Sequence, residues 1–154
     1  MGLDMYLTRH TYTKNWDYTP EDKKLEISIK QNGKEFGIID PRKITYIIEE
    51  VGYWRKANQI HRFFVERCQD GVDDCKEYYV PIETLEELFG LCKRVLKNPS
   101  KAEELLPVQE GFFFGSTAYD SYYFENIKYT INVIESILNH KRSEMQFYYY
   151  ESSW

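Results

Sequence analysis

The sequence has no long run of apolar residues, and its first residues do not resemble a leader. A transmembrane helix needs about 20 consecutive apolar residues, and no stretch approaches that length. The opening MGLDMYLTRH has an acid at position 4 and lacks the basic start and apolar run of a secretion signal. Gly2 is followed by Tyr6, where an N-myristoylation motif needs serine or threonine. We therefore expect a cytoplasmic protein with no membrane partner.

Concentrated basic charge is also lacking. The formal net charge is −5 at pH 7, and the densest basic runs are only residue pairs, such as those at 23–24, 55–56 and 141–142. A protein that binds duplex DNA needs a basic face that neutralises several phosphates. The sequence therefore excludes a DNA duplex as the expected partner, and it leaves open a small anion held by one or two cations.

Cysteine is scarce and odd in number, with Cys68, Cys75 and Cys92 only, which favours reduced thiols over a disulfide framework. The spacing of Cys68 and Cys75 does not match a zinc ribbon, and the three histidines lie far apart in the chain. The acidic loop 69–74 lacks the alternating ligands of a calcium-binding loop. We expect no metal and no other cofactor.

Signature motifs of the common enzyme classes are missing. The chain has no GxxxxGK[ST] phosphate loop, no GxGxxG after a strand and no GxSxG nucleophile turn. No catalytic residues are therefore predicted.

Tyrosine, in contrast, is abundant. Aromatic residues make up 17% of the chain, and 14 of them are tyrosines. A tyrosine combines a large apolar ring with a hydroxyl, so this excess suits hydrated pockets and interfaces as well as a core.

Alternating patterns predict strands, and apolar residues at helical spacing predict helices. Strands are expected over 3–9, 25–30, 77–80 and 146–150, and helices over 55–68, 84–98, 102–106 and 119–139. Asn32-Gly33 predicts a tight hairpin turn, while 44–51 fits a helix or a strand. We expect one α+β domain over 1–154, in which a small, mainly antiparallel sheet with an N-terminal hairpin packs against about three helices.

The segment YWRKANQIH (53–61) groups a cation, an amide, an imidazole and aromatic rings. An arginine can bind a phosphate or carboxylate, and a tyrosine or tryptophan can stack on a base. Each residue also has a structural alternative in the core or on a solvated face. The candidate ligand-binding residues here are Tyr53, Trp54, Arg55, Lys56, Asn58 and His61.

The segment GFFFGSTAYD (111–120) leads into the longest predicted helix. Thr117 and Asp120 fit a capping box that serves this helix, which reduces its capacity to bind an anion. The remaining candidates to line a polar, aromatic pocket are Ser116, Tyr119 and Tyr123, together with Tyr122. This pocket requires that the two segments meet in space.

Several phrases of the chain resemble an uncharacterised family of small phage and bacterial proteins. They are MGLDMYL, YWRKANQIH, QDGVDDC, LLPVQEGFFFGSTAYDSYY and the terminal FYYYESSW. Some family members carry a phosphoglycerate kinase label, but this chain is too short for that two-domain enzyme and has no nucleotide loop for it. The resemblance supplies no catalytic residues. It implies a phage or mobile-element context, in the cytoplasm of a host cell.

The leading hypothesis is therefore a phage-type binding protein without catalysis, which sequesters a phosphorylated or nucleotide signalling molecule of host antiviral defence. The alternative is an interaction module that inhibits or adapts a host protein through its tyrosine-rich surface and the C-terminal residues Ser152, Ser153 and Trp154. A third is an enzyme that acts on a nucleotide, with His61 as general base. The oligomeric state is left open, with a homo-oligomer among the alternatives.

Overall fold

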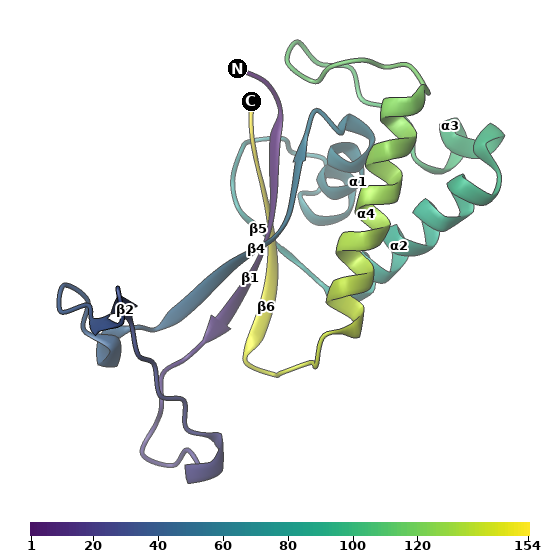
Figure 1. Ribbon diagram of the computed structural model, residues 1–154. Helices are drawn as coiled ribbons and strands as arrows, with labels where there is room; N and C mark the ends of the chain where they lie inside the picture. Colours follow the sequence, from purple (N-terminus) through teal and green to yellow (C-terminus); the bar gives the residue numbers. More distant parts are fainter.

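A four-stranded antiparallel sheet organises the molecule. The computed structural model describes residues 1–154, and the strand order is β4-β1-β6-β5. The strands are β1 (Asp4–Tyr12), β4 (Tyr46–Arg55), β5 (Tyr78–Val80) and β6 (Gln146–Ser153). β1 pairs with both β4 and β6, so the two ends of the chain lie side by side (Figure 1). The α+β class and the antiparallel sheet expected from the sequence are confirmed.

The helices pack against one face of this sheet. They are α1 (Asn58–Cys68), α2 (Ile82–Lys97), the short α3 (Ala102–Leu105) and α4 (Ser121–Asn139), and α4 lies between the sheet and α2 in Figure 1. Because side chains alternate along a strand, Met5, Leu7 and Tyr150 face the helices and are buried with them in one core. The opposite face of the sheet carries no helix.

Residues 14–45, which we call the arm, connect β1 to β4 and project away from the helical layer (Figure 1). The arm contains a separate two-stranded sheet, β2 (Lys30–Gln31) and β3 (Lys34–Glu35), and the short 3₁₀ turns η1 (Glu21–Lys23) and η2 (Pro41–Lys43). The predicted Asn32-Gly33 turn is confirmed, with positive φ at both residues. The predicted strand over 25–30 is wrong, because only Lys30 pairs with a neighbouring strand.

The ambiguous segment 44–51 becomes most of strand β4. Its isoleucines fit helical spacing, but Tyr46 to Arg55 pair with β1 along its whole length. This pairing between distant parts of the chain decides the conformation, as is common for residues with high β propensity.

No helix of the molecule is long and apolar enough to cross a bilayer.

Three predicted helix starts are wrong. The helix expected from residue 55 begins at Asn58 as α1, because strand β4 continues to Arg55. Thr84 and Glu87 have the spacing of a capping box, but α2 begins at Ile82 after Pro81, so Thr84 lies inside the helix and Glu87 forms an ion pair with Arg67. The cap of α4 is Asp120, whose carboxylate accepts a hydrogen bond from the backbone N–H of Tyr123 at 3.1 Å. A third 3₁₀ turn, η3 (Pro99–Lys101), precedes α3.

The capping of α4 can be tested by two neighbouring alanine substitutions. We expect Asp120→Ala to lower the free energy of unfolding by ~1 kcal/mol, because it leaves an amide of the first helical turn without its partner. Thr117→Ala is the control and is expected to have little effect. Urea unfolding of both variants checks this, and a larger loss for Thr117→Ala would contradict the assignment of the cap.

Candidate functional site

The face of the sheet that no helix covers carries a continuous surface of aromatic side chains. We call it the open face. It comprises Asp4, Tyr6, Thr8, His10 and Tyr12 of β1, with their neighbours Tyr46, Ile48, Glu50, Tyr53, Arg55, Glu77, Tyr79, Phe147, Tyr149 and Glu151. None of these residues is buried, whereas Leu3, directly before β1, and the alternate residues Met5 and Leu7 of β1 are completely buried.

The rings of the open face contact one another across the strands. Ring centroids lie 5.3 Å apart for Tyr6 and Tyr53, 4.3 Å for His10 and Tyr149, and 5.2 Å for Tyr12 and Tyr46. Tyr79 lies 6.0 Å from Tyr149 and 6.3 Å from Phe147. These separations are in the range of favourable aromatic pairs. The contacts hold the rings in place, so a partner would meet an ordered surface.

Carboxylates outnumber arginine and lysine side chains on the open face. Asp4, Glu50, Glu77 and Glu151 face one arginine, Arg55, and Glu77 lies 3.5 Å from the imidazole of His10. The hydroxyl of Tyr53 donates to Asp4, and this hydrogen bond raises the pKa of Tyr53. The surface therefore favours a partner that is apolar or basic over a polyanion.

The two segments singled out in the sequence do meet, at one end of the open face. The hydroxyl of Tyr122 donates to the carbonyl of Arg55 at 2.6 Å. Lys56 has a φ of +55°, and its side chain packs against Gly115, where an added Cβ would lie 3.1 Å from the Cβ of Lys56. The Arg55 guanidinium is half exposed and lies 3.9 Å from Asp4. This corner therefore places the Arg55 and Lys56 side chains together at Gly2, and Asp4 links Arg55 to the hydroxyl of Tyr53.

Asn58 is the residue that joins the two segments, and it is buried. Its amide donates to the carbonyl of Phe114 at 3.0 Å and to that of Ser116 at 2.8 Å. Its side-chain oxygen accepts from the backbone N–H of Gln109 at 3.1 Å. All three bonds tie the loop 109–116 to the start of α1, so Asn58 has a structural role here.

The other candidate aromatic residues also have partners within the protein. The Trp54 ring is buried, and its Nε1–H donates to Thr130 at 2.9 Å. The buried Tyr123 hydroxyl donates to the carbonyl of Leu106 at 2.8 Å. The half-buried Tyr119 accepts a hydrogen bond from the backbone N–H of Val108 at 3.3 Å. Ser116 is exposed, and its hydroxyl accepts from the N–H of Ala118 at 3.1 Å.

His61 lies in a buried relay. Its Nδ1 is 2.7 Å from the hydroxyl of Tyr150, and its Nε2 is 2.8 Å from Asp73, which also accepts from the indole of Trp154 at 3.1 Å. For a neutral ring, Nε2–H donates to Asp73 and Nδ1 accepts from Tyr150. With 1% exposure and both nitrogens engaged, the imidazole has no contact with solvent through which it could act as a general base.

The relay predicts a dependence of stability on pH. Burial lowers the pKa of His61 below its ordinary 6.5, and Asp73 opposes this only in part. His61 therefore binds a proton more readily in the unfolded chain than in the folded chain. The stability that the neutral, buried imidazole contributes is fully present above pH 6.5, and it is lost as the pH falls through the lower pKa of the folded state.

We expect His61→Gln to lower the free energy of unfolding by about 1–3 kcal/mol at neutral pH, because buried partners lose their hydrogen bonds. It should also flatten the decrease of melting temperature on the acidic side. His140→Gln removes an exposed imidazole and is the control. Thermal melts across the acidic range check this, and an unchanged slope for His61→Gln would contradict the role of this residue.

Two of the three thiols are not activated. Cys68 and Cys75 are half-buried and Cys92 is buried, and all three are free. Burial raises the pKa of Cys68 to about 11 and raises that of Cys92 as well. Both are therefore protonated at neutral pH, and no group of three or more His, Cys, Asp or Glu is arranged to hold a metal ion.

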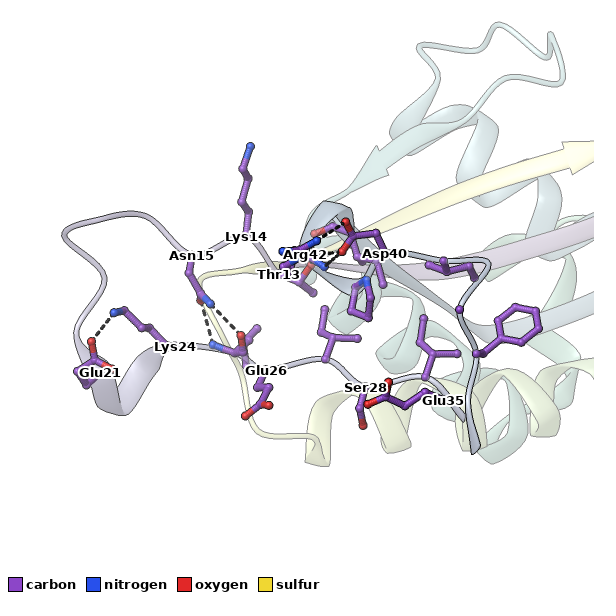
Figure 2. Close-up of a pocket in the computed structure, with 18 residues that line it drawn as sticks. Thr13, Lys14, Asn15, Glu21, Lys24, Glu26, Ser28, Glu35, Asp40 and Arg42 are labelled. Atoms are coloured by element: carbon purple, nitrogen blue, oxygen red, sulfur yellow. Dashed lines mark hydrogen bonds and ion pairs between the residues drawn. The ribbon is translucent and has the colours of Figure 1, made fainter. Parts of the chain in front are cut away.

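A concave region lies within the arm (Figure 2). It is an open hollow of about 1110 Å³, lined by arm residues and by Thr13. Its Lys24 is paired with Glu21, and Arg42 makes two hydrogen bonds of 3.0 Å to the carboxylate of Asp40. Asn15 bonds both backbone groups of Leu25 and closes one end of the loop. Lys24 and Arg42 therefore already have carboxylate partners, and Lys14 is the one cation of the lining without such a partner, so the hollow does not favour a phosphate.

Sequence reasoning missed most of the open face. The signal was present in β1, where Tyr6, His10 and Tyr12 occupy alternate positions, but their neighbours come from distant strands. Of the C-terminal residues considered for a contact, Ser152 is buried, while Trp154 is half exposed.

Comparisons with protein-family models, with curated proteins and with solved structures found no match for this chain.

Proposed function

We propose that this chain is a non-catalytic interaction module that binds another protein through the open face. The observation that carries this is the uncovered sheet face with ordered aromatic rings and an excess of carboxylates. Aromatic residues are enriched at protein interfaces, where their rings supply contact area and their hydroxyls supply hydrogen bonds. The flat shape of a sheet face suits a protein surface better than a small ligand, which needs a concave pocket.

The proposal can be tested by capture of a partner from a bacterial lysate. We expect the wild-type chain to retain a partner, and the double variant Tyr6→Ser/Tyr149→Ser to weaken this binding at least tenfold, or about 1.4 kcal/mol. Tyr18→Ser is the matched control, because Tyr18 is an exposed tyrosine of the arm. Equal capture by the wild-type chain and the double variant would contradict the proposal.

A second candidate function is the sequestration of a phosphorylated or nucleotide ligand, in the phage context that the family resemblance implies. It is favoured by the corner where Arg55 and Lys56 lie together at Gly2 and contact residues of the loop 111–123, with Tyr53 linked to Arg55 through Asp4. A guanidinium can bind a phosphate there while the ring stacks on a base. The Trp54, Asn58, His61 and Tyr123 side chains would support this corner from within the core.

Calorimetry against a panel of cyclic and linear nucleotides tests this second function. We expect binding that Arg55→Gln weakens at least tenfold, because the substitution removes the charge and the planar pair of donors. Arg42→Gln is the control, since Arg42 lies in the arm and is paired with Asp40. Absence of heat with every nucleotide of the panel would rule this function out.

A further inference from the structure

The arm and the start of β4 form a long segment without a core. None of residues 14–50 is buried. The segment nevertheless carries twelve large apolar or aromatic side chains: Trp16, Tyr18, Leu25, Ile27, Ile29, Phe36, Ile38, Ile39, Ile44, Tyr46, Ile47 and Ile48. Folding a segment costs conformational entropy, which burial of apolar surface normally offsets. Within one copy of the chain this segment has little of that compensation, because only Ile27, Ile29, Phe36 and Ile44 of these twelve are even half-buried.

The hollow of the arm shows where burial is missing. Leu25, Ile27, Ile29, Phe36, Ile39 and Ile44 contribute the apolar part of its lining. The interior of a folded protein fills a space of this size with side chains. Figure 2 shows the lining residues of the arm around an open space, with the helices on the far side. No segment of the same chain fills it.

The first half of strand β4 adds an unprotected edge to this surface, whereas α4 covers the second half, where Tyr129 accepts from the N–H of Tyr53 and Tyr122 donates to the carbonyl of Arg55. The strand is ten residues long and pairs with β1 on one side only. Tyr46 to Glu50 are five consecutive exposed residues, and Ile48 is 59% exposed. Natural proteins usually protect such an edge with lysine, proline or a covering loop. This stretch contains neither lysine nor proline, so it can accept another strand.

We propose that two copies of this chain associate through the arm and the edge of β4, with the two β4 strands antiparallel about a two-fold axis at Ile48. In this register Ile48 faces its own copy, Ile47 lies opposite Glu49, and Tyr46 lies opposite Glu50. No glutamate then lies opposite a glutamate, which would be unfavourable. A two-fold interface uses the same surface on both partners, and the two sheets become continuous.

The charge distribution favours a second copy as the partner. Seven of the 20 basic residues and six of the 25 acidic residues lie between positions 14 and 45, which gives the arm a charge of +1 and the rest of the chain −6. An arm that lies against the body of the other copy therefore meets opposite charge. The aromatic rings of the segment can each bury ~150–250 Å², and a standard interface needs about 800 Å² per partner.

Light scattering after size exclusion tests the association. We expect a mass of twice 18.6 kDa for the wild-type chain and 18.6 kDa for Ile48→Lys, which places two lysines together at the two-fold axis. Tyr79→Lys is the matched control, because Tyr79 is exposed on the opposite edge strand β5, and it should remain a dimer. Circular dichroism confirms folding of each variant. A monomeric wild-type chain, or an Ile48→Lys variant that remains a dimer, overturns the proposal.

A cysteine at the axis tests the register independently of stability. Directly opposite residues of antiparallel strands have Cα atoms ~4.5–5.5 Å apart, a separation that a disulfide spans. Mild oxidation should therefore link Ile48→Cys chains into dimers in high yield, at least tenfold above the wild-type chain and Tyr79→Cys. Equal linking of Ile48→Cys and Tyr79→Cys overturns the register. The open-face variant Tyr6→Ser/Tyr149→Ser should still dimerise. The test of dimerisation is therefore independent of the test of partner binding through the open face.

Discussion

Replacement of Trp54 by alanine is expected to lower the free energy of unfolding by ~3–5 kcal/mol, because it leaves a large cavity in the core. Trp54 is 2% exposed, contacts the ring of Phe64 and donates to Thr130. Its ring also covers Gly52, where an added Cβ would lie 2.8 Å from the indole. A loss of this size is a large fraction of the ~5–15 kcal/mol that stabilises a typical domain. Urea unfolding followed by circular dichroism measures it.

Trp16→Ala is the control for this substitution. Trp16 lies in the arm and is 46% exposed, and its ring contacts only other exposed or half-buried side chains, those of Tyr12, Tyr18 and Lys14. We expect it to change the stability of the monomer by less than about 1 kcal/mol, as surface substitutions usually do. Similar losses for the two tryptophans would show that the core is not organised around Trp54 as described.

Replacement of Asn58 by alanine is expected to lower the free energy of unfolding by about 2–4 kcal/mol and to release the loop 109–116. The substitution removes three hydrogen bonds, and it leaves the carbonyls of Phe114 and Ser116 and the N–H of Gln109 without these partners. Hydrogen exchange should therefore accelerate in this loop, and chymotrypsin should cleave more rapidly at Phe112 and Phe113.

Ser116→Ala is the matched control, because Ser116 lies in the same region but its hydroxyl accepts one exposed hydrogen bond. It should leave both the loop and the overall stability close to wild type. A stable Asn58→Ala variant with an unchanged loop would contradict the structural role of Asn58. It would return this residue to the set of free ligand-binding candidates.

The open face illustrates why strand pairing is difficult to read from sequence. In β4 the residues of this face occupy even positions up to Glu50 and odd positions from Tyr53. The register shift at Leu7/Thr8 sets Gly52 opposite Leu7 and Glu50 opposite Thr8, so Val51 is an extra residue. A bulge of this kind reverses which side chains face outward. The regular alternation that would identify the surface is therefore interrupted within the strand that supplies a third of it.

The sequence by itself determined the features that depend on neighbouring residues. The Asn32-Gly33 turn needs only two residues that accept positive φ, and α1 and α4 follow from apolar residues at helical spacing. It also identified the two segments that meet at Arg55 and Tyr122.

The tertiary structure alone decided three other features: the strand conformation of 44–51, the burial of His61 between Tyr150 and Asp73, and the exposure of the arm. Each depends on residues far apart in the chain, whose contacts override local preference because burial and strand pairing are set by the whole fold.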